Sequence, residues 1–390
     1  MTDPSILSHA ARVLATFSSE LPADAALRRY LAGSRRLGPG ERRSISRAVF
    51  AYFRWIRWLD PKAPAQRQVE EALSMSERFA HDPRAVKTEA LAALAVPPWL
   101  AEEMDVPVEF VRQLQREPVL WLRARPGTAA RLAAELGDCA TTPLSPDALR
   151  YNGQKDLFLT TQFHAGAFEI QDLASQLVSA LAAPVPGQAW WDACAGEGGK
   201  TLHLADLLQN RGVVWATDRS LRKLEVLKRR AARAKLFNCR STLWNSEPDQ
   251  ARPGQPPRLP FKTKFDGVLL DAPCSGVGTW RRNPHARWTT SQRDVRELPG
   301  IQASLLRRAA EAVKPGGILL YSVCTLTRSE TTAVSSAFTA DHPEFEPETR
   351  LAPGTPLAEA AGSLGASVFL WPQTLDANGM FVASWRRRKT

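Results

Sequence analysis

Two cysteines follow apolar runs that are typical of buried β-strands. The first run, Gly267–Leu270, leads into the carboxylate of Asp271, and Cys274 comes shortly after it. The second run is GILLYS, residues 317–322, and Cys324 lies just beyond it. Because open α/β sheets bind ligands at the carboxyl ends of their strands, we expect both thiols and the acid at one sheet edge. A buried cysteine is commonly an inert core residue, but two thiols beside an acid favour a reactive site.

Two thiols and a carboxyl group suit methylation of carbon-5 of a cytosine. That carbon is a poor nucleophile until a thiolate adds to carbon-6, and protonation of ring nitrogen N3 by a carboxyl group assists the addition. A second thiol can assist the later release, when the carbon-5 proton leaves and the first thiol is eliminated. A nearby cation such as Lys200 favours the thiolate at neutral pH. The target base must be single-stranded or flipped out to reach such a site.

A glycine-rich loop and a further acid indicate a nucleotide-like cofactor. The loop DACAGEGGKT, Asp192–Thr201, follows a candidate strand and opens a helix, where a ligand can approach the backbone closely. It is not a Walker A loop, because Cys194 stands where that loop needs its first glycine, and it lacks Gly-x-Gly-x-x-Gly spacing. Asp218 ends the next candidate strand, where an acid binds ribose hydroxyls or caps the helix that starts near Ser220. These features fit either a dinucleotide or S-adenosylmethionine.

Strands and helices alternate through the second half of the chain, which predicts an α/β fold with a doubly wound, mostly parallel sheet. A turn at 376–379 lies between SVFLW and GMFVASW and predicts a terminal antiparallel strand pair. The predicted strands are 189–193, 213–217, 241–244, 267–271 and 317–322, and the predicted helices are 170–181, 201–209, 221–236 and 301–313.

The N-terminal part has the pattern of helices. In ERRSISRAVFAYFRWIRWL, apolar residues recur at helical spacing and arginines occupy the opposite side. Such an arginine stripe suits an RNA backbone, or it is a solvated helix face. The apolar residues are Ile45, Val49, Phe53 and Ile56, and the arginines are Arg43, Arg47, Arg54 and Arg57. We predict an all-α domain over residues 1–104, a small α/β subdomain over 105–165 and the doubly wound domain over 166–390.

Composition narrows the class of protein and its partners. The chain has 390 residues, a net charge of +11 and five cysteines. The positive charge favours a polyanionic partner such as a nucleic acid. No C-x-x-C pair occurs, which argues against zinc, and the odd number of cysteines argues against a disulfide framework. The N-terminus has no basic region before its short apolar run, and no apolar stretch is long enough to span a bilayer. We therefore expect a cytoplasmic protein without metal or membrane attachment.

Five segments resemble the RsmB/NOP/Sun-type RNA (cytosine-5)-methyltransferases, in the order found in that family. They are GAFEIQDLAS, DACAGEGGKT, TDRS, DAPCSGVGTWRRNPHARW and YSVCT, all within the C-terminal part of the chain. The resemblance is closest to the bacterial 16S ribosomal RNA members. It implies a Rossmann-like class I methyltransferase domain that uses S-adenosylmethionine. The helical N-terminus resembles, more weakly, the NusB-like RNA-binding domain of those members.

The resemblance also implies a role for individual residues. Cys324 would attack carbon-6, Cys274 would promote product release, and Asp271 would contact both the base and the cofactor. Lys200 would point toward the reacting base, and Asp218 would hold the ribose. The loop around the methionine end of the cofactor would comprise Cys194, Ala195, Gly196, Glu197, Gly198, Gly199 and Lys200.

Two departures from the family pattern affect the predicted cofactor site. Gly196 and Glu197 stand where the family usually has Ala-Pro, which replaces a rigid turn by a flexible, charged one. Asn245 aligns with an acid that lies near the adenine in the family, and an amide can still hydrogen-bond that ring. Arg281 and Arg282 follow the first thiol and are predicted to contact the RNA backbone, as is the arginine stripe.

The sequence therefore predicts a monomeric, S-adenosylmethionine-dependent RNA cytosine-5 methyltransferase. Ribosomal RNA is the preferred substrate, because of the N-terminal resemblance, and transfer RNA is the second choice. Two other classes use some of the same features. A nicotinamide-dependent dehydrogenase would share the sheet but leaves the two strand-end cysteines unexplained, and a non-catalytic RNA-binding protein would use only the basic faces.

Overall fold

The computed structural model describes residues 3–18, 21–34, 36–244 and 259–389, which form two compact units. The first unit comprises Met1–Pro118 and Gly276–Asp294, and the second comprises Val119–Ser275 and Val295–Thr390. The unit boundaries differ from the predicted domains in two places. The first unit extends beyond the boundary predicted at 104, and it includes a segment that the prediction assigned to the doubly wound domain.

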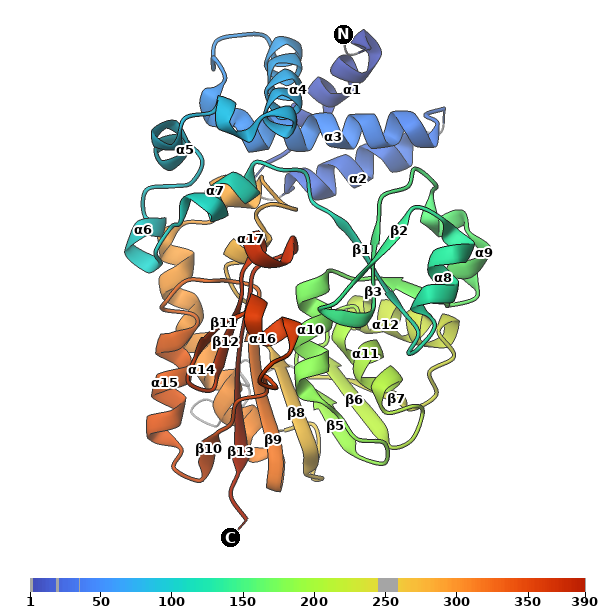
Figure 1. The fold of residues 1–390 in the computed structure, drawn as a ribbon, viewed down its shortest axis with the longest axis vertical. Coiled ribbons are helices and arrows are strands. Elements are labelled where there is room, and N and C mark those ends of the chain that lie inside the picture. Colours follow the sequence, from blue (N-terminus) through green and yellow to red (C-terminus); the bar gives the residue numbers. More distant parts are fainter. Residues whose placement is uncertain (1–2, 19–20, 35, 245–258, 390) are drawn as a thin grey trace, which may run out of the picture. The chain divides into compact units, whose positions relative to one another are not determined.

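The first unit is helical (Figure 1). α1 and α3 begin at prolines, Pro4 and Pro39, which lack the N–H group that would have no acceptor within the first turn of the helix. Asp3 accepts a hydrogen bond from the backbone N–H of Ser5 at the start of α1. The helices are α1 (Pro4–Leu14), α2 (Ala23–Gly33), α3 (Pro39–Trp55), α4 (Ala65–His81), α5 (Thr88–Leu94), α6 (Leu100–Glu103), α7 (Val108–Leu114) and α13 (Ala286–Thr289), with single 3-10 turns at Ile56–Trp58, Pro83–Ala85 and Val277–Thr279.

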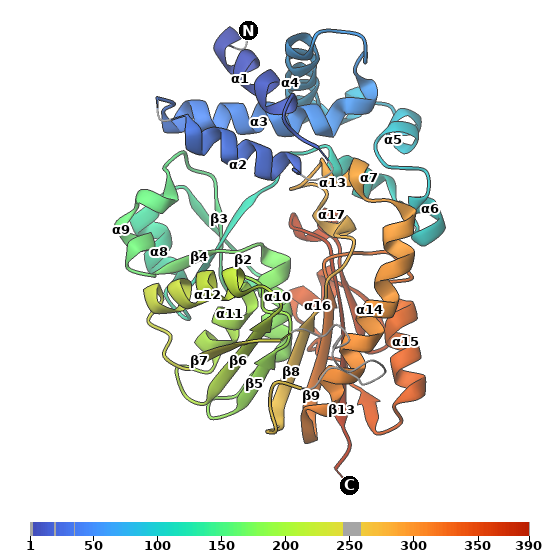
Figure 2. The same cartoon turned by 180° about the vertical axis from the view of Figure 1, so that it is seen from behind.

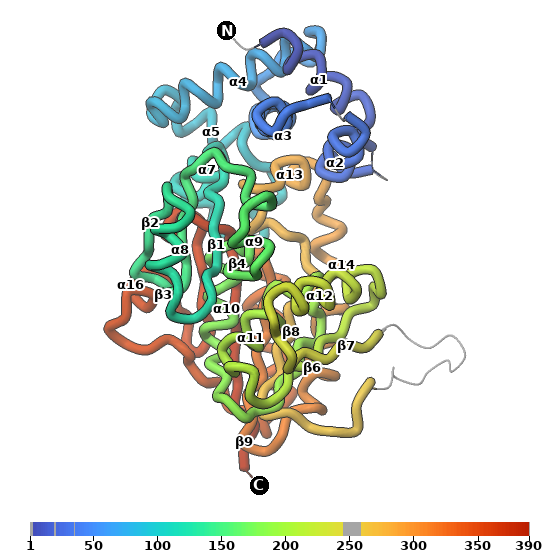
Figure 3. The backbone as a smooth tube through the Cα atoms, turned by 90° about the vertical axis from the view of Figure 1, so that its right-hand side faces the viewer, coloured from blue at the N-terminus to red at the C-terminus, as the bar shows by residue number. Residues whose placement is uncertain are grey.

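Helix α3 is central to this unit and packs against α1 and α4 (Figure 3). Its predicted apolar face is confirmed for Ile45, Val49 and Phe53, which are all buried. Trp55 at its end is also buried and donates a hydrogen bond to Ser76 Oγ of α4. The apolar periodicity of α3 therefore predicted correctly which side faces the core.

A small antiparallel sheet begins the second unit, with strand order β2-β3-β1-β4. β2 and β3 form an antiparallel hairpin, and the helix α8 precedes it in the chain. The elements are β1 (Leu120–Ala124), α8 (Ala129–Leu136), β2 (Cys139–Thr142), β3 (Ser145–Tyr151), a 3-10 turn (Leu157–Leu159), α9 (Thr161–His164) and β4 (Phe168–Ile170).

The large sheet of the second unit contains nine strands within the part of the chain that is described. Its main order is β11-β12-β13-β9-β8-β5-β6-β7, and β10 pairs with β13. The pairs from β9 to β7 are parallel, and β13 joins them antiparallel to β9. The strands are β5 (Ala189–Asp192), β6 (Val213–Asp218), β7 (Cys239–Leu243), β8 (Phe265–Asp271), β9 (Val313–Val323), β10 (Phe345–Pro347), β11 (Gly362–Leu364), β12 (Ser367–Leu370) and β13 (Met380–Arg387).

The predicted doubly wound sheet and its terminal antiparallel pair are confirmed, but the sheet is mixed rather than mostly parallel, since four of its described pairings are parallel and four are antiparallel. β12 and β13 pair antiparallel, with Phe369 opposite Phe381. Helices cover both faces of the sheet (Figures 1 and 2). They are α10 (Leu173–Ala182), α11 (Gly199–Leu207) and α12 (Leu221–Arg233) on one face, and α14 (Gln292–Glu311) and α15 (Thr332–Asp341) on the other, with short helices α16 (Pro356–Ala360) and α17 (Pro372–Leu375) near the antiparallel strands.

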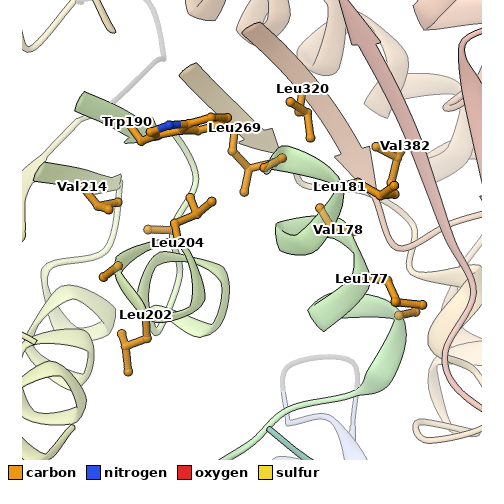
Figure 4. Close-up of a cluster of buried hydrophobic side chains, with 14 of the residues drawn as sticks. Leu177, Val178, Leu181, Trp190, Leu202, Leu204, Val214, Leu269, Leu320 and Val382 are labelled. Atoms are coloured by element: carbon orange, nitrogen blue, oxygen red, sulfur yellow. The ribbon is translucent and has the colours of Figure 1, made fainter. Parts of the chain in front are cut away.

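Aliphatic side chains of α10 and α11 pack against the face of the sheet that these helices cover (Figure 4). Leu177 and Val178 of α10 share this core with Leu269 of β8 and Leu320 of β9. Close packing also explains the glycine inside β8. A Cβ atom on Gly267 would lie 2.3 Å from the Trp190 ring, so only glycine lets that indole lie flat against its neighbour strand.

Candidate active site

The carboxyl ends of the parallel strands bring the predicted site residues together in the second unit. β8 ends at Asp271 and lies between β5, which ends at Asp192, and β9. Asp271 pairs in register with Ser322 of β9, and Cys324 follows the end of that strand. The expectation that both thiols leave neighbouring strands at one edge is therefore confirmed.

The two thiols are in direct contact. Cys274 Sγ lies 3.3 Å from Cys324 Sγ, within hydrogen-bonding distance for sulfur. The hydrogen bond with Cys324 raises the pKa of Cys274 well above its ordinary value, and burial raises it further. Cys274 therefore holds its proton more tightly than an ordinary thiol does. Either sulfur can be the donor in the contact between the two thiols.

An ion pair lies beside the thiols. Lys200 Nζ is 2.6 Å from Asp271 Oδ2, and Ser322 Oγ donates a hydrogen bond of 2.8 Å to Asp271 Oδ1. Burial is the largest single effect and lowers the pKa of Lys200, but the charge and hydrogen bond of Asp271, together with weaker effects of Cys324 and Asp192, outweigh it and the pKa is raised. The charge of Cys324 acts in the same direction. Lys200 therefore stays cationic, as a group that favours a neighbouring thiolate must.

A cavity of about 770 Å³ opens next to this pair. Its wall includes the acids Asp192, Asp218 and Asp271, the ring of Trp244, and residues of α14 such as Ile301. Most of the predicted loop lines it as well, namely Cys194, Ala195, Gly196, Glu197, Gly199 and Lys200. Three acids and apolar walls suit a ligand that combines a cationic centre, hydroxyl groups and a flat ring.

The glycine-rich loop has two glycines with left-handed backbone. Gly196 has φ of +56° and borders the cavity, with open space where a Cβ would stand. Gly198 has φ of +88°, and a Cβ there would lie 2.6 Å from Leu227 Cγ of α12. Gly198 is therefore required by the close packing of the loop on α12, whereas Gly196 leaves room for a ligand.

Asp218 holds the loop rather than capping the next helix. Its Oδ2 accepts a hydrogen bond of 3.0 Å from the Gly196 N–H, and its Oδ1 accepts one of 2.8 Å from the Ser220 N–H. The N-cap of α12 is Ser220, whose side chain accepts a hydrogen bond from the Lys223 N–H. Asp218 also lines the cavity, so its carboxylate can bind a ligand and order the loop at once.

Sequence reasoning did not assign a role to Asp192, although the acid ends the first strand of the motif. Its Oδ2 accepts a hydrogen bond of 2.6 Å from Thr201 Oγ1, while its buried Oδ1 has no hydrogen-bond partner among the described residues. Burial raises its pKa to about 7, against the lowering effect of the Thr201 hydrogen bond. A buried oxygen without a donor at the cavity wall marks a place for a donor on a ligand. The position of Asp192 at the end of its strand was the available signal.

Arg54 of the predicted stripe and Arg281, predicted separately to contact the RNA backbone, are both buried in the first unit, so the predicted exposure is wrong for these two residues. Arg54 is 2% exposed, and its Nη2 donates to the backbone oxygen of Arg281. Arg281 is also buried and donates to the backbone oxygen of Glu117. A segment distant in sequence covers this part of α3, which helical spacing cannot reveal. Exposed positions are taken by Arg43, Arg47, Arg57 and Arg282, of which Arg47 forms an ion pair with Glu117.

Three other predictions concern Asn245, metal binding and membrane attachment. Asn245 lies outside the described residues. Within the described ranges, no three His, Cys, Asp or Glu side chains are grouped as metal ligands would be. No described helix combines the length and the apolar character that crossing a bilayer requires.

The sequence of this chain is similar to those of known ribosomal RNA methyltransferases. Residues 179–386 match the family described as 16S rRNA methyltransferase RsmB/F. A Bacillus subtilis protein named "Probable ribosomal RNA small subunit methyltransferase B" is 36% identical over 226 residues, which are 58% of this chain and 49% of that protein. A Synechocystis protein of the same name is 31% identical over 283 residues, or 70% of this chain and 61% of that one. The chain thus spans about half to three fifths of the length of these relatives.

The solved structure of PH0851 has the same fold along the whole chain. It superimposes with a TM-score of 0.77, at 22% identity, and the match covers 99% of both chains. The two chains therefore share one fold, an α/β region with a helical region before it. Because the family match covers more than half of the chain, including both thiols and the glycine-rich loop, the chain belongs to the RsmB/F family of 16S rRNA methyltransferases.

Proposed function

We propose that this protein transfers a methyl group from S-adenosylmethionine to carbon-5 of a cytosine in RNA. The observation that carries the proposal is the contact between Cys274 and Cys324, 3.3 Å apart. The ion pair of Lys200 and Asp271 lies beside it, at the wall of an acidic cavity. A nicotinamide-dependent dehydrogenase leaves the contact between the two thiols unexplained.

The residues of the cavity fit S-adenosylmethionine. Asp218 would accept hydrogen bonds from the ribose hydroxyls, as acids at this position of such sheets do. Asp192 Oδ1, which has no donor among the described residues, would accept a hydrogen bond from the ammonium group. The open space at Gly196 admits the methionine end. When bound, the cofactor supplies an electrophilic methyl group, and the nearby carboxylates favour its positive charge.

The thiols divide the chemistry between them. Cys324 would add to carbon-6 of the cytosine: the raised pKa of Cys274 keeps that other thiol protonated, and the charge of Lys200 interacts with Cys324. That addition makes carbon-5 nucleophilic. Asp271 would contact the base from the end of β8. Cys274, next to the new carbon–sulfur bond, would assist the step in which the carbon-5 proton leaves and Cys324 is eliminated.

RNA is the proposed partner, and ribosomal RNA the proposed substrate. The net charge of +11 favours a polyanion, and the names of the relatives specify the small-subunit ribosomal RNA. Arg43, Arg57 and Arg282 are exposed in the first unit and would contact phosphates. The two buried arginines, Arg54 and Arg281, would instead maintain the surface that carries these groups.

Replacement of each thiol tests the proposal directly. With labelled RNA, Cys274→Ala should accumulate a covalent protein–RNA adduct on a denaturing gel, because release loses its assisting group. Cys324→Ala should form no adduct and transfer no tritium from labelled S-adenosylmethionine. Cys139→Ala, on β2 of the small sheet, is the matched control and should behave as wild type. An adduct that persists in Cys324→Ala would refute the assignment.

Two further measurements separate the alternatives. RNA binding without any methyl transfer by the wild-type protein would favour a non-catalytic RNA-binding protein. Bisulfite sequencing of RNA from cells with and without the protein should reveal one protected cytosine that depends on it. If that cytosine lies in transfer RNA, the ribosomal substrate is wrong while the chemistry stands.

A further inference from the structure

Glu330 is a fully buried acid in the connection between β9 and α15, close to both thiols but with no place in the chemistry above. Its exposed fraction is 0%. A buried carboxylate costs free energy unless donors satisfy it. The residues that donate to it come from the loops that carry Cys274 and Cys324, which suggests what the acid does.

Glu330 holds the loop of Cys274. Its Oε1 accepts a hydrogen bond of 2.9 Å from the Ser275 N–H and its Oε2 accepts one from Ser275 Oγ. The Gln302 amide donates to Glu330 Oε1 at 2.9 Å and also to the Pro273 carbonyl at 3.0 Å. Both neighbours of Cys274 in the chain are thus tied to one buried pair of side chains.

Glu330 also holds the loop of Cys324. Thr327 Oγ1 donates to Glu330 Oε2 at 2.8 Å. Ser275 Oγ and Thr325 Oγ1 are 2.9 Å apart. Because Ser275 Oγ donates its single proton to Glu330, Thr325 Oγ1 is the donor in its hydrogen bond with Ser275 Oγ. The residue after each thiol is therefore linked to the residue after the other thiol, with Glu330 setting the direction of the hydrogen bonds.

A third contact fixes Glu330 to the sheet. The hydroxyl of Tyr321 on β9 donates to the Glu330 carbonyl at 2.7 Å and to Gln302 Oε1 at 3.1 Å. Tyr321 is fully buried, so the acid has little freedom to move. The distance between the thiols is consequently set by a network anchored in the core, and not by the thiols themselves.

We propose that Glu330 is the positioning residue of the thiol pair: it holds the loops of Cys274 and Cys324 so that the second thiol stays in contact with the first. The proposal rests on the proposed function for its catalytic consequence. Its geometric part does not, because the contact between the thiols can be measured without RNA or cofactor.

Oxidative cross-linking measures that contact. Diamide converts two neighbouring thiols to a disulfide and takes up the two protons and two electrons that they lose. Peptide mass spectrometry of the full-length protein identifies the Cys274–Cys324 bond and gives its rate of formation. Glu330→Ala should form the disulfide at least about tenfold more slowly than the wild-type protein. A loop displacement of about 1 Å lowers the fraction of time that the two sulfur atoms spend in a reactive geometry. Glu330→Gln keeps the shape and an acceptor for Ser275, and should cross-link at nearly the wild-type rate.

A matched control separates positioning from general destabilisation. Val178→Ala removes core volume from α10, which takes no part in the hydrogen bonds of Glu330 described above, and should lower the melting temperature while cross-linking at the wild-type rate. If Glu330→Ala does not fold, Ser275→Ala replaces it, because it removes the hydroxyl that joins the two loops. Cross-linking at the wild-type rate in the folded Glu330→Ala protein, or in Ser275→Ala when the former is unfolded, would overturn the proposal.

Methylation kinetics give the second readout. For Glu330→Ala, kcat should fall about 100-fold with an unchanged KM for RNA, and Glu330→Gln should recover most of the loss. If the wild-type protein methylates no RNA, the proposed function fails, while the cross-linking rates still decide the role of Glu330. If kcat falls equally in Glu330→Ala and Val178→Ala, the acid is only structural and the proposal is wrong.

Discussion

Replacing Asp192 by asparagine should remove a large part of the pH dependence of stability. Burial raises the pKa of Asp192 from 3.8 to about 7 in the folded protein, and the charges of Asp271 and Asp218 add to the effect. The Thr201 hydroxyl opposes it by donating to Oδ2. In the unfolded chain the carboxyl returns to its ordinary value. Folding therefore favours the protonated acid, which asparagine mimics in shape and charge.

The sign and size follow from the two pKa values. Between about pH 4 and pH 7 the folded state binds a proton that the unfolded state has lost, so stability decreases as pH rises through this window. A shift of about 3 pKa units corresponds to about 4 kcal/mol, and roughly 2–3 kcal/mol of it falls between pH 5 and pH 8. Asp192→Asn should thus gain stability relative to wild type by this amount over that interval.

Urea unfolding of the two unliganded proteins at pH 5, 6, 7 and 8 measures the difference. Comparing variants at each pH cancels the contributions of other titrating groups. Asp341→Asn, at the exposed end of α15, is the matched control and should keep the wild-type pH dependence. A difference between Asp192→Asn and wild type that stays constant from pH 5 to pH 8 would refute the reasoning. Calorimetry should also show weaker S-adenosylmethionine binding, because the amide cannot offer a charged acceptor.

Three other substitutions test separate parts of the molecule. Gly198→Ala should destabilise the loop by about 1–3 kcal/mol and weaken cofactor binding, because its φ of +88° and the approach of Leu227 leave no room for a Cβ; calorimetric titration checks it, and wild-type affinity would contradict it. Arg287→Met should destabilise the first unit by about 3 kcal/mol, because the fully buried guanidinium donates to two backbone carbonyls that would lose their partner; urea unfolding measures this loss. Lys200→Met should leave the fold intact but lower kcat about 100-fold, since Asp271 and the thiols lose the adjacent positive charge; an unchanged kcat in a methylation assay would show that the charge is not needed.

The sheet and its site edge could be predicted because they depend on local patterns. Apolar runs that end in an acid or a thiol predict both a strand and its carboxyl end, and parallel strands bring those ends to one side. Asp271, Cys274 and Cys324 therefore met as expected. The apolar face of α3 followed from 3.6-residue periodicity in the same way. The arginine at position 54 did not, because its burial depends on Arg281, far along the chain.

Local patterns could not reveal the groups whose meaning depends on distant partners. In the sequence, Glu330 resembles any other acid in a polar connecting segment. Only its hydrogen bonds with Ser275 and Gln302 in the folded protein distinguish it from a solvent-exposed acid. The domain limits were also missed where a helical unit takes in a segment, Gly276–Asp294, from the middle of the catalytic sequence. Both features depend on contacts between residues far apart in the chain, and local sequence patterns do not reveal such contacts.

The sequence by itself therefore determined which reactive groups the site contains: two strand-end thiols, an acid, a lysine and a glycine-rich loop in a doubly wound sheet. Residue type and spacing are sufficient for that, because strand ends and loop backbones follow from short segments. Tertiary structure alone decided which of these groups touch and in what state. The contact of Cys274 with Cys324, the proton that Cys274 keeps and the burial of Asp192 all arise from packing between segments far apart in the chain. Burial and neighbouring charge set those properties, and both exist only once the chain has folded.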